Sequence, residues 1–261
     1  MHQKRYYYLI KVQYLGYRLH GWQRQPNLKT VEGLIKKTLK YVLPERKIKL
    51  LGSSRTDAMV SANDAAFELF LYDAPLVDIN AFLDLFNVNL PPDIKATSIR
   101  EVESSFNIIQ HPKQKEYIYL FAFGAKNHPF CAPLMANFQE DLDLEMMQEG
   151  AKIFEGEHYF GNFCVDANTH TRVIRPVVTS SIQINTLYTA NFFPEKSYVF
   201  TVKGGGFLRY QIRLMMGALV QLGKGEITIQ YIKDSLEAGS SVQMNYIAPA
   251  SGLILNKIDF K

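Results

Sequence analysis

Strand patterns and amphipathic helix patterns alternate irregularly along the whole chain, and this order constrains the fold more than any other feature of the sequence. The patterns do not recur as the regular strand, helix, strand units that build a parallel sheet. The composition, 47% hydrophobic and 21% charged residues, is that of a folded protein. We therefore expect an α+β fold with a largely antiparallel sheet.

Hydrophobic periodicity places strands at residues 6–15, 48–51, 65–72, 94–102, 116–123, 173–184, 198–202 and 253–260. It places helices at residues 31–42, 79–87, 144–154, 207–222 and 229–238. Thr30 is expected to cap the first helix, and Pro91-Pro92 to end the second. We expect an N-terminal basic α+β domain in residues 1–105 and a C-terminal α+β domain in residues 106–261.

Charge is distributed very unevenly along the chain. Residues 1–55 hold 13 Lys and Arg against two acids, a net of +11, whereas the remaining residues hold 16 bases and 23 acids, a net of −7. Neutralising phosphates supplies most of the sequence-independent affinity for a nucleic acid. The N-terminal segment therefore predicts a polyanionic partner, and it disfavours a metabolic enzyme that binds one small phosphate at the turn Gly204-Gly205-Gly206.

Several classes of protein are not indicated by the sequence. The apolar run after Arg5 is too short and too rich in tyrosine for a signal peptide, and no run approaches the roughly 20 apolar residues that span a bilayer. Cys131 and Cys164 are far apart and lack neighbours at zinc spacing. We expect a cytoplasmic protein with no disulfide framework, no metal and no cofactor.

The loop Gly52-Ser53-Ser54-Arg55-Thr56-Asp57-Ala58 sets one carboxylate and one guanidinium among small residues. A loop Asp is commonly a turn or capping residue, but a second feature favours chemistry. Arg209 and Arg213 fall four residues apart in the apolar helix predicted at 207–222. A guanidinium there is costly unless it meets an anion, so Arg213 either pairs with Asp57 or a phosphate, or extends its stem over the core to the surface.

Aromatic and basic residues complete the candidate site. Tyr117 and Tyr119 point to one face of a strand, where a ring can stack on a nucleobase for roughly 1–3 kcal/mol. Gly21-Trp22-Gln23-Arg24-Gln25 contains the only Trp, which either contacts RNA or anchors a surface loop. The first helix carries Lys36, Lys37 and Lys40 on its polar side, where they contact phosphate or only face solvent.

In order and spacing, these pieces together resemble the TruA-type tRNA pseudouridine synthases over almost the whole chain. The matching segments are Gly21-Trp22-Gln23 with Gln25, Thr30-Val31, Ser54-Arg55-Thr56-Asp57-Ala58, Asn87 with Asn89-Leu90-Pro91-Pro92-Asp93-Ile94, Lys115-Glu116-Tyr117, Thr171-Arg172 with Ile174, Phe207-Leu208 with Arg213 and Gly217, and Ala248-Pro249-Ala250 with Gly252-Leu253.

The resemblance implies a cofactor-independent isomerase that converts uridine to pseudouridine in the tRNA anticodon arm, at positions 38–40. It implies two similar α/β halves around a shared, mostly antiparallel central sheet with the active-site cleft between them, and a homodimer that binds tRNA. Asp57 would be the catalytic carboxylate, Tyr117 would stack on the uracil and Arg213 would hold Asp57. Arg55 and Thr56 would join Trp22, Gln23, Gln25, Lys36, Lys37 and Lys40 in binding RNA.

The chain departs from the family pattern at two places. Met59-Val60-Ser61-Ala62 stands where Gly-Val-His-Ala is usual, and Asn107-Ile108-Ile109 follows Phe106 where His-Ala-Arg is typical. These departures motivate one alternative, a catalytically inactive RNA-binding paralogue that acts as a tRNA folding or assembly factor. Retention of Arg55, Asp57, Tyr117 and Arg213 weighs against that alternative, because a binding module has no need of the isolated acid.

Overall fold

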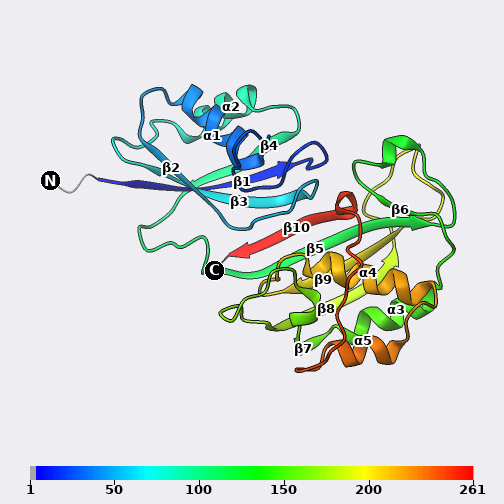
Figure 1. The fold of residues 1–261 in the computed structure, drawn as a ribbon. Coiled ribbons are helices and arrows are strands. Elements are labelled where there is room, and N and C mark those ends of the chain that lie inside the picture. Colours follow the sequence, from blue (N-terminus) through cyan, green and yellow to red (C-terminus); the bar gives the residue numbers. More distant parts are fainter. Residues whose placement is uncertain (1–3, 261) are drawn as a thin grey trace. The chain divides into compact units, whose positions relative to one another are not determined.

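The computed structural model describes residues 4–260. These residues form ten strands, five α-helices and three short 3-10 helices (Figure 1). The strands are β1 (Tyr6–Tyr14), β2 (Ile48–Gly52), β3 (Ser61–Leu71), β4 (Ile94–Glu101), β5 (Pro112–Phe123), β6 (Ala136–Phe138), β7 (Gly156–Tyr159), β8 (Ile174–Ile184), β9 (Tyr198–Gly204) and β10 (Leu253–Phe260). The α-helices are α1 (Val31–Val42), α2 (Ile79–Asn89), α3 (Leu144–Ile153), α4 (Gln211–Gly223) and α5 (Ile229–Ser235). The predicted α+β class is confirmed.

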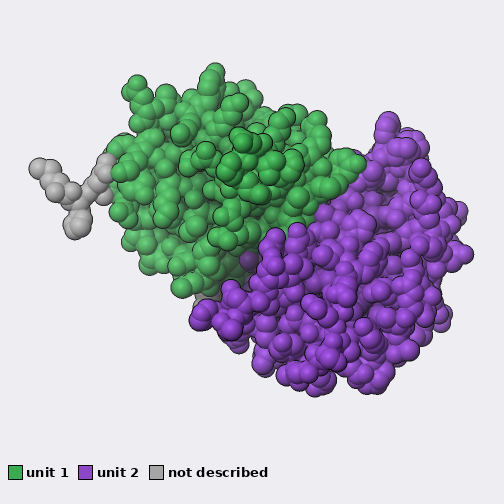
Figure 2. Space-filling view, in the orientation of Figure 1, with its two compact units in different colours: residues 1–113, 255–261 green, residues 114–254 purple. Residues whose placement is uncertain are grey.

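The chain divides into two compact units (Figure 2). Unit 1 comprises residues 1–113 and 255–261, and unit 2 comprises residues 114–254. The last strand of the sequence therefore belongs mainly to the unit that contains the first strand.

Unit 1 is a twisted sheet whose faces are covered unequally. Its strands run β4-β1-β3-β10, with β2 also pairing antiparallel with β3. Alternate residues of β1 and β3 lie on opposite faces. Tyr8, Ile10 and Phe67, on one face, have no exposed surface, and α1 and α2 lie on one side of these strands (Figure 1). On the other face Leu9 and Ala66 pack with Ile108, from the segment after β4, and partly buried side chains such as Phe106 and Phe260 pack against this small cluster.

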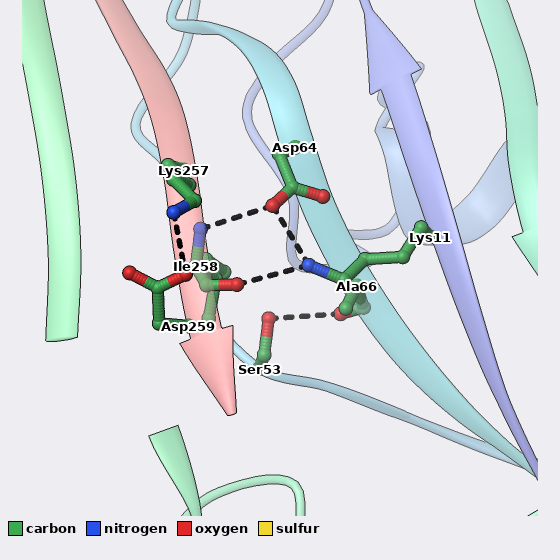
Figure 3. Close-up of polar contacts among 7 residues, drawn as sticks. All are labelled: Lys11, Ser53, Asp64, Ala66, Lys257, Ile258 and Asp259. Carbon is green, nitrogen blue, oxygen red and sulfur yellow. Dashed lines mark hydrogen bonds and ion pairs between the residues drawn. The ribbon is translucent and has the colours of Figure 1, made fainter. Parts of the chain in front are cut away.

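A partly buried ion pair fixes β10 within unit 1 (Figure 3). Lys11 Nζ of β1 donates to Asp64 Oδ2 of β3 at 2.7 Å and to the Ile258 carbonyl of β10 at 2.9 Å. The Ile258 N–H donates to the same Asp64 oxygen at 3.1 Å. One lysine therefore ties three strands together, and the network spans chain segments almost 250 residues apart.

Unit 2 combines a sheet with three helices. Its strands run β5-β9-β8-β7, all antiparallel, and β6 pairs parallel with the end of β5. A buried hydrophobic cluster on one face of this sheet includes Ile118, Leu120 and Val199. The partly buried side chains of Phe192 and Phe193 pack against this cluster. Helix α4 is buried along almost its whole length. Gly150 of α3 lets that helix approach α4, since a Cβ there would lie 2.5 Å from a Leu222 methyl carbon.

Three sequence expectations need correction. Helix α4 begins at Gln211 and not at residue 207, because Tyr210 adopts a left-handed conformation with φ of 62°. Arg209 therefore precedes the helix, where it pairs with Asp166, and the two arginines do not share one helix. The Gly204-Gly205-Gly206 turn is likewise separated from the helix N-terminus. The short strands β6 and β7 were not predicted.

Candidate active site

The loop that carries Asp57 follows β2 and is held by the segment between β1 and α1. The backbone N–H of Trp22 donates to the Thr56 carbonyl at 3.0 Å, and the Tyr14 and Thr56 hydroxyls lie 2.9 Å apart. Within the loop, the Val60 N–H donates to the Asp57 carbonyl at 3.2 Å. Asp57 itself is half-buried. The backbone on both sides of Asp57 is therefore fixed.

The indole of Trp22 lies directly against the end of β2. Only 3% of Trp22 is exposed, and its ring lies 6.1 Å from the Tyr14 ring, centroid to centroid. A Cβ at Gly52 would lie 2.3 Å from Trp22 Nε1, a distance that no real contact reaches. Gly52 thus leaves the space that the indole fills. Trp22 anchors the loop, which is the second of the two roles considered from the sequence.

Two departures from the family pattern have defined structural roles. Met59 adopts φ of 67°, the left-handed region that favours glycine, and its N–H donates to the Leu19 carbonyl at 2.9 Å. The Ser61 hydroxyl accepts the Gly16 N–H at 2.9 Å and is buried. Met59 is 37% exposed, so a thioether lies at the surface two residues from Asp57.

The segment after Phe106 is the other departure. Asn107 Oδ1 accepts the N–H groups of Ile109 and Gln110, which closes a turn. The turn inserts Ile108, fully buried, against Leu9 and Ala66 of the sheet. Ile109 is 57% exposed at the position where the family pattern has a base.

The predicted RNA-binding residues fall into two groups by exposure. Arg55, Gln23 and Gln25 are exposed around the loop, and Gln25 Nε2 donates to the His20 carbonyl at 3.3 Å. Thr56 and Trp22 are buried, so they support the loop and do not present side chains to a large ligand.

Helix α1 presents its lysines beside this loop segment. Lys37 and Lys40 are exposed and Lys36 is half-buried, while Ile35 and Leu39 face the core. The helix begins as predicted, with Thr30 Oγ1 accepting the Gly33 N–H at 3.3 Å. The Val31 N–H donates to the Gly21 carbonyl and the Glu32 N–H to the Trp22 carbonyl, so the helix start and the Trp22 segment form one rigid piece.

Arg213 lies on α4 in unit 2, where its guanidinium is oriented by a crossing segment. Its Nε donates to the Ala248 carbonyl at 2.7 Å, and its guanidinium carbon lies 5.0 Å from the centre of the Tyr210 ring. The Ala248 N–H donates back to the Arg213 carbonyl at 3.1 Å. Gly217 makes this crossing possible, because a Cβ there would lie 1.8 Å from the Tyr246 carbonyl oxygen. The buried Tyr119 hydroxyl donates to the Pro249 carbonyl at 2.8 Å and fixes the same segment.

Tyr117 lies on β5 in unit 2 and is held by an aromatic neighbour. Its ring meets that of Phe207 edge to face, with centroids 5.5 Å apart and planes at 87°. The preceding residue, Glu116, pairs with Lys203 across the strands at 2.7 Å. Burial lowers the pKa of Lys115 to about 8, because the charged ammonium loses hydration.

Asp57 and the predicted RNA-binding residues thus lie in unit 1, whereas Arg213 and Tyr117 lie in unit 2. Sequence reasoning missed Tyr14, whose hydroxyl bonds to Thr56. It also missed Tyr119 and the Ala248 carbonyl as supports of Arg213. The one sequence signal for Tyr14 and Tyr119 is the alternation of side chains along β1 and β5, which places both rings toward the interior. Their polar partners are 42 and 130 residues away in sequence.

Comparison with known proteins places this arrangement in a family. Residues 151–261 match the family model described as tRNA pseudouridine synthase. The chain is 35% identical over 255 residues to tRNA pseudouridine synthase A of Thermosipho melanesiensis, covering 97% of this chain and 99% of the relative. It is 30% identical over 252 residues to tRNA pseudouridine synthase A of Thermodesulfovibrio yellowstonii, covering 95% and 97%. The chain belongs to the tRNA pseudouridine synthase family, a family of isomerases.

Two negative findings apply to residues 4–260. No helix among them is long and apolar enough to cross a membrane. Among the same residues, no group of three or more His, Cys, Asp or Glu side chains is placed to hold a metal ion.

Proposed function

We propose that this protein isomerises uridine to pseudouridine in tRNA, at positions 38–40 of the anticodon arm, with Asp57 as the catalytic carboxylate. The observation that carries the proposal is the Asp57 loop. Its backbone is fixed through Thr56 by the Tyr14 hydroxyl and the backbone N–H of Trp22, and Asp57 is half-buried in a loop of small residues. The full-length match to synthases of the A type supports the substrate class.

The reaction exchanges one bond for another within the nucleotide. The C1′–N1 bond breaks and a C1′–C5 bond forms, while C5 loses a proton and N1 gains one. Breaking the glycosidic bond develops positive charge at C1′, which a fixed carboxylate stabilises or captures. The atoms balance with no oxidant, reductant or cofactor. Orientation of the carboxylate therefore matters more than its basicity.

Arg213 and Tyr117 have separate proposed roles on the same nucleotide. A guanidinium keeps a carboxylate ionised and oriented, and the Nε bond to Ala248 fixes the plane of Arg213 for that task. Stacking on an aromatic ring, at roughly 1–3 kcal/mol, offsets much of the few kcal/mol needed to extrude a base. The Phe207 contact holds the Tyr117 ring in one orientation. We further propose that two copies of the chain bind one tRNA.

Tritium release tests the proposal directly. Unmodified tRNA transcripts carrying C5-tritiated uridine are incubated with the protein, and the released label is counted. We expect release from a transcript with uridine at positions 38–40, and loss of release when those uridines are replaced by cytidine. Release that persists after the replacement would move the target elsewhere. Tight binding without release from any transcript would favour the inactive RNA-binding paralogue.

A further inference from the structure

Three cations rest on aromatic rings at the end of the unit 1 sheet that lies farthest from the Asp57 loop. Lys49 Nζ lies 5.1 Å from the centre of the Phe70 ring. Lys47 Nζ and the Arg5 guanidinium carbon lie 5.1 and 5.3 Å from the centre of the Tyr72 ring. We call this set, with Tyr7, the basic aromatic surface. It is formed by Arg5, Tyr7, Lys47, Lys49, Phe70 and Tyr72.

Strand register places these side chains on one face. Tyr7 of β1 and Lys49 of β2 are both direct partners of Phe70 in β3, and partners directly opposite point to the same side of a sheet. The Tyr7 and Phe70 rings meet edge to face at 5.5 Å. This face is opposite the one on which Tyr8 and Leu69 are fully buried. The basic aromatic surface is therefore separate from the lysines of α1.

The surface concentrates positive charge. Because Arg5 and Lys47 rest on the same ring, their charged groups are at most about 10 Å apart, which is about one Debye length at 0.1 M salt. All three cations are exposed. Two neighbouring acids are Asp73, whose Oδ2 accepts the backbone N–H of Lys47 at 3.4 Å, and Glu68, which interacts electrostatically with Lys49. The rings reduce the freedom of the long side chains and hold the charges outward without neutralising them.

The position of this surface sets its relation to the loop. Lys47 directly precedes β2, and Gly52 is its last residue, where the Asp57 loop starts. At ~3.3 Å per residue, the five residues of β2 separate Lys47 from the start of the loop by about 17 Å. A ligand that reaches both is a long polyanion and not a nucleotide. Ordered, exposed, clustered cations are the arrangement that contacts a phosphate backbone.

We propose that the basic aromatic surface is a second RNA-binding surface, which contacts the phosphate backbone of the substrate RNA away from the modified nucleotide. The inference rests on the proposed function for the identity of the polyanion. It assigns Arg5, Lys47 and Lys49 to affinity and register, with no part in the chemistry and no preference for base sequence.

The test measures binding of an unmodified tRNA transcript over a range of salt concentrations. The slope of log K against log salt is negative, and each lost phosphate contact reduces its magnitude by roughly 0.7 to 0.9. Replacing Arg5, Lys47 and Lys49 together by Gln is expected to reduce the magnitude of the slope by about 2 and to weaken binding at least 10-fold at low salt. Lys47→Arg with Lys49→Arg, which keeps the charges, is expected to retain the slope.

The matched control replaces three exposed lysines of unit 2, Lys126, Lys152 and Lys233, by Gln. It makes the same change in net charge and is expected to leave the slope within about 0.5 of the wild-type value, because charges away from the RNA release no counterions. An unchanged slope in the first triple variant, or an equal fall in the control, would overturn the inference. Binding needs no turnover, so a wild type that releases no tritium would defeat the proposed function alone.

Discussion

Replacing Gly52 by Ala tests how the Asp57 loop is held. The new Cβ would lie 2.3, 2.5 and 2.7 Å from Trp22 Nε1, Cε2 and Cζ2. Carbon atoms in contact are about 3.5–4.0 Å apart, so the indole must move by about 1 Å or more. Because Trp22 is buried and its backbone N–H donates to the Thr56 carbonyl, a shift of the indole that moves the Trp22 backbone also displaces the residue next to Asp57.

The magnitude of each effect follows from this geometry. Overpacking a close-packed site costs about 1–3 kcal/mol of unfolding free energy, which lowers the melting temperature by roughly 2–4 °C per kcal/mol in a chain of this size. A misplacement of about 1 Å at a reacting group costs on the order of 100-fold in rate. We therefore expect Gly52→Ala to melt several degrees lower and to lose about 100-fold in kcat/KM for tritium release.

A second substitution separates the indole from other causes. Trp22→Phe removes the part of the ring that the new Cβ would strike, so Gly52→Ala in the Trp22→Phe background is expected to cost less than in the wild type. Circular dichroism melting and tritium release are measured for all four proteins of the cycle. Wild-type melting and kcat/KM in Gly52→Ala would refute the argument that the indole supports the loop. Costs that simply add would assign the effect to another contact.

The remaining predictions concern strain, a buried acid and the β10 clamp. Met59→Gly removes the strain of a left-handed residue and is expected to raise the unfolding free energy by about 1 kcal/mol. Met59→Ala keeps the strain and is expected to give no such gain. Equal denaturant midpoints for the two variants would contradict this prediction. Burial raises the pKa of Glu68, whose Oε1 has no hydrogen-bond partner. The stability that its protonation supplies is full below the ordinary value of 4.5 and is lost as pH rises through the raised pKa. Glu68→Gln should therefore melt higher than wild type at pH 7 and not at pH 4, and the same gain at both values would exclude titration as the cause. Lys11→Met leaves the partly buried Asp64 without its cation and is expected to cost about 1–3 kcal/mol. Lys11→Met with Asp64→Leu should recover part of this cost, and a melting temperature unchanged in the single variant would show that the pair contributes nothing.

Local sequence patterns determined most of the secondary structure. The strand beginning at Tyr6, the helix capped by Thr30 and the closing strand at Leu253–Phe260 were predicted from periodicity and capping and are confirmed. The start of α4 was misplaced because the apolar pattern continues through Phe207 and Leu208, while the left-handed Tyr210 interrupts the backbone. Strand β6 has three residues and β7 has four, too few for a period to be detected.

The sequence indicates which residues are candidates for the site, but it does not indicate the contacts that support them. The small residues around Asp57 marked the loop from the sequence alone. The Tyr14 hydroxyl, the space at Gly52 and the Ala248 carbonyl act through contacts between distant segments, which no local pattern encodes. The left-handed conformation of Met59 was not predicted, because Met itself gives no sign of positive φ and only the glycine usual at this position in the family pattern hints at it. Ser61 illustrates the same limit, since its bond to Gly16 depends on how the two loops meet.

Tritium release by Asp57→Ala, measured beside the wild type and alongside equilibrium binding of the same transcript, tests the central claim most directly. The exposed loop residues and the lysines of α1 remain in this variant, so binding should stay within a few-fold of the wild type. Release should fall to the uncatalysed background, because no other carboxylate is assigned to C1′. Substantial release by Asp57→Ala would contradict the assignment of Asp57 as the catalytic carboxylate.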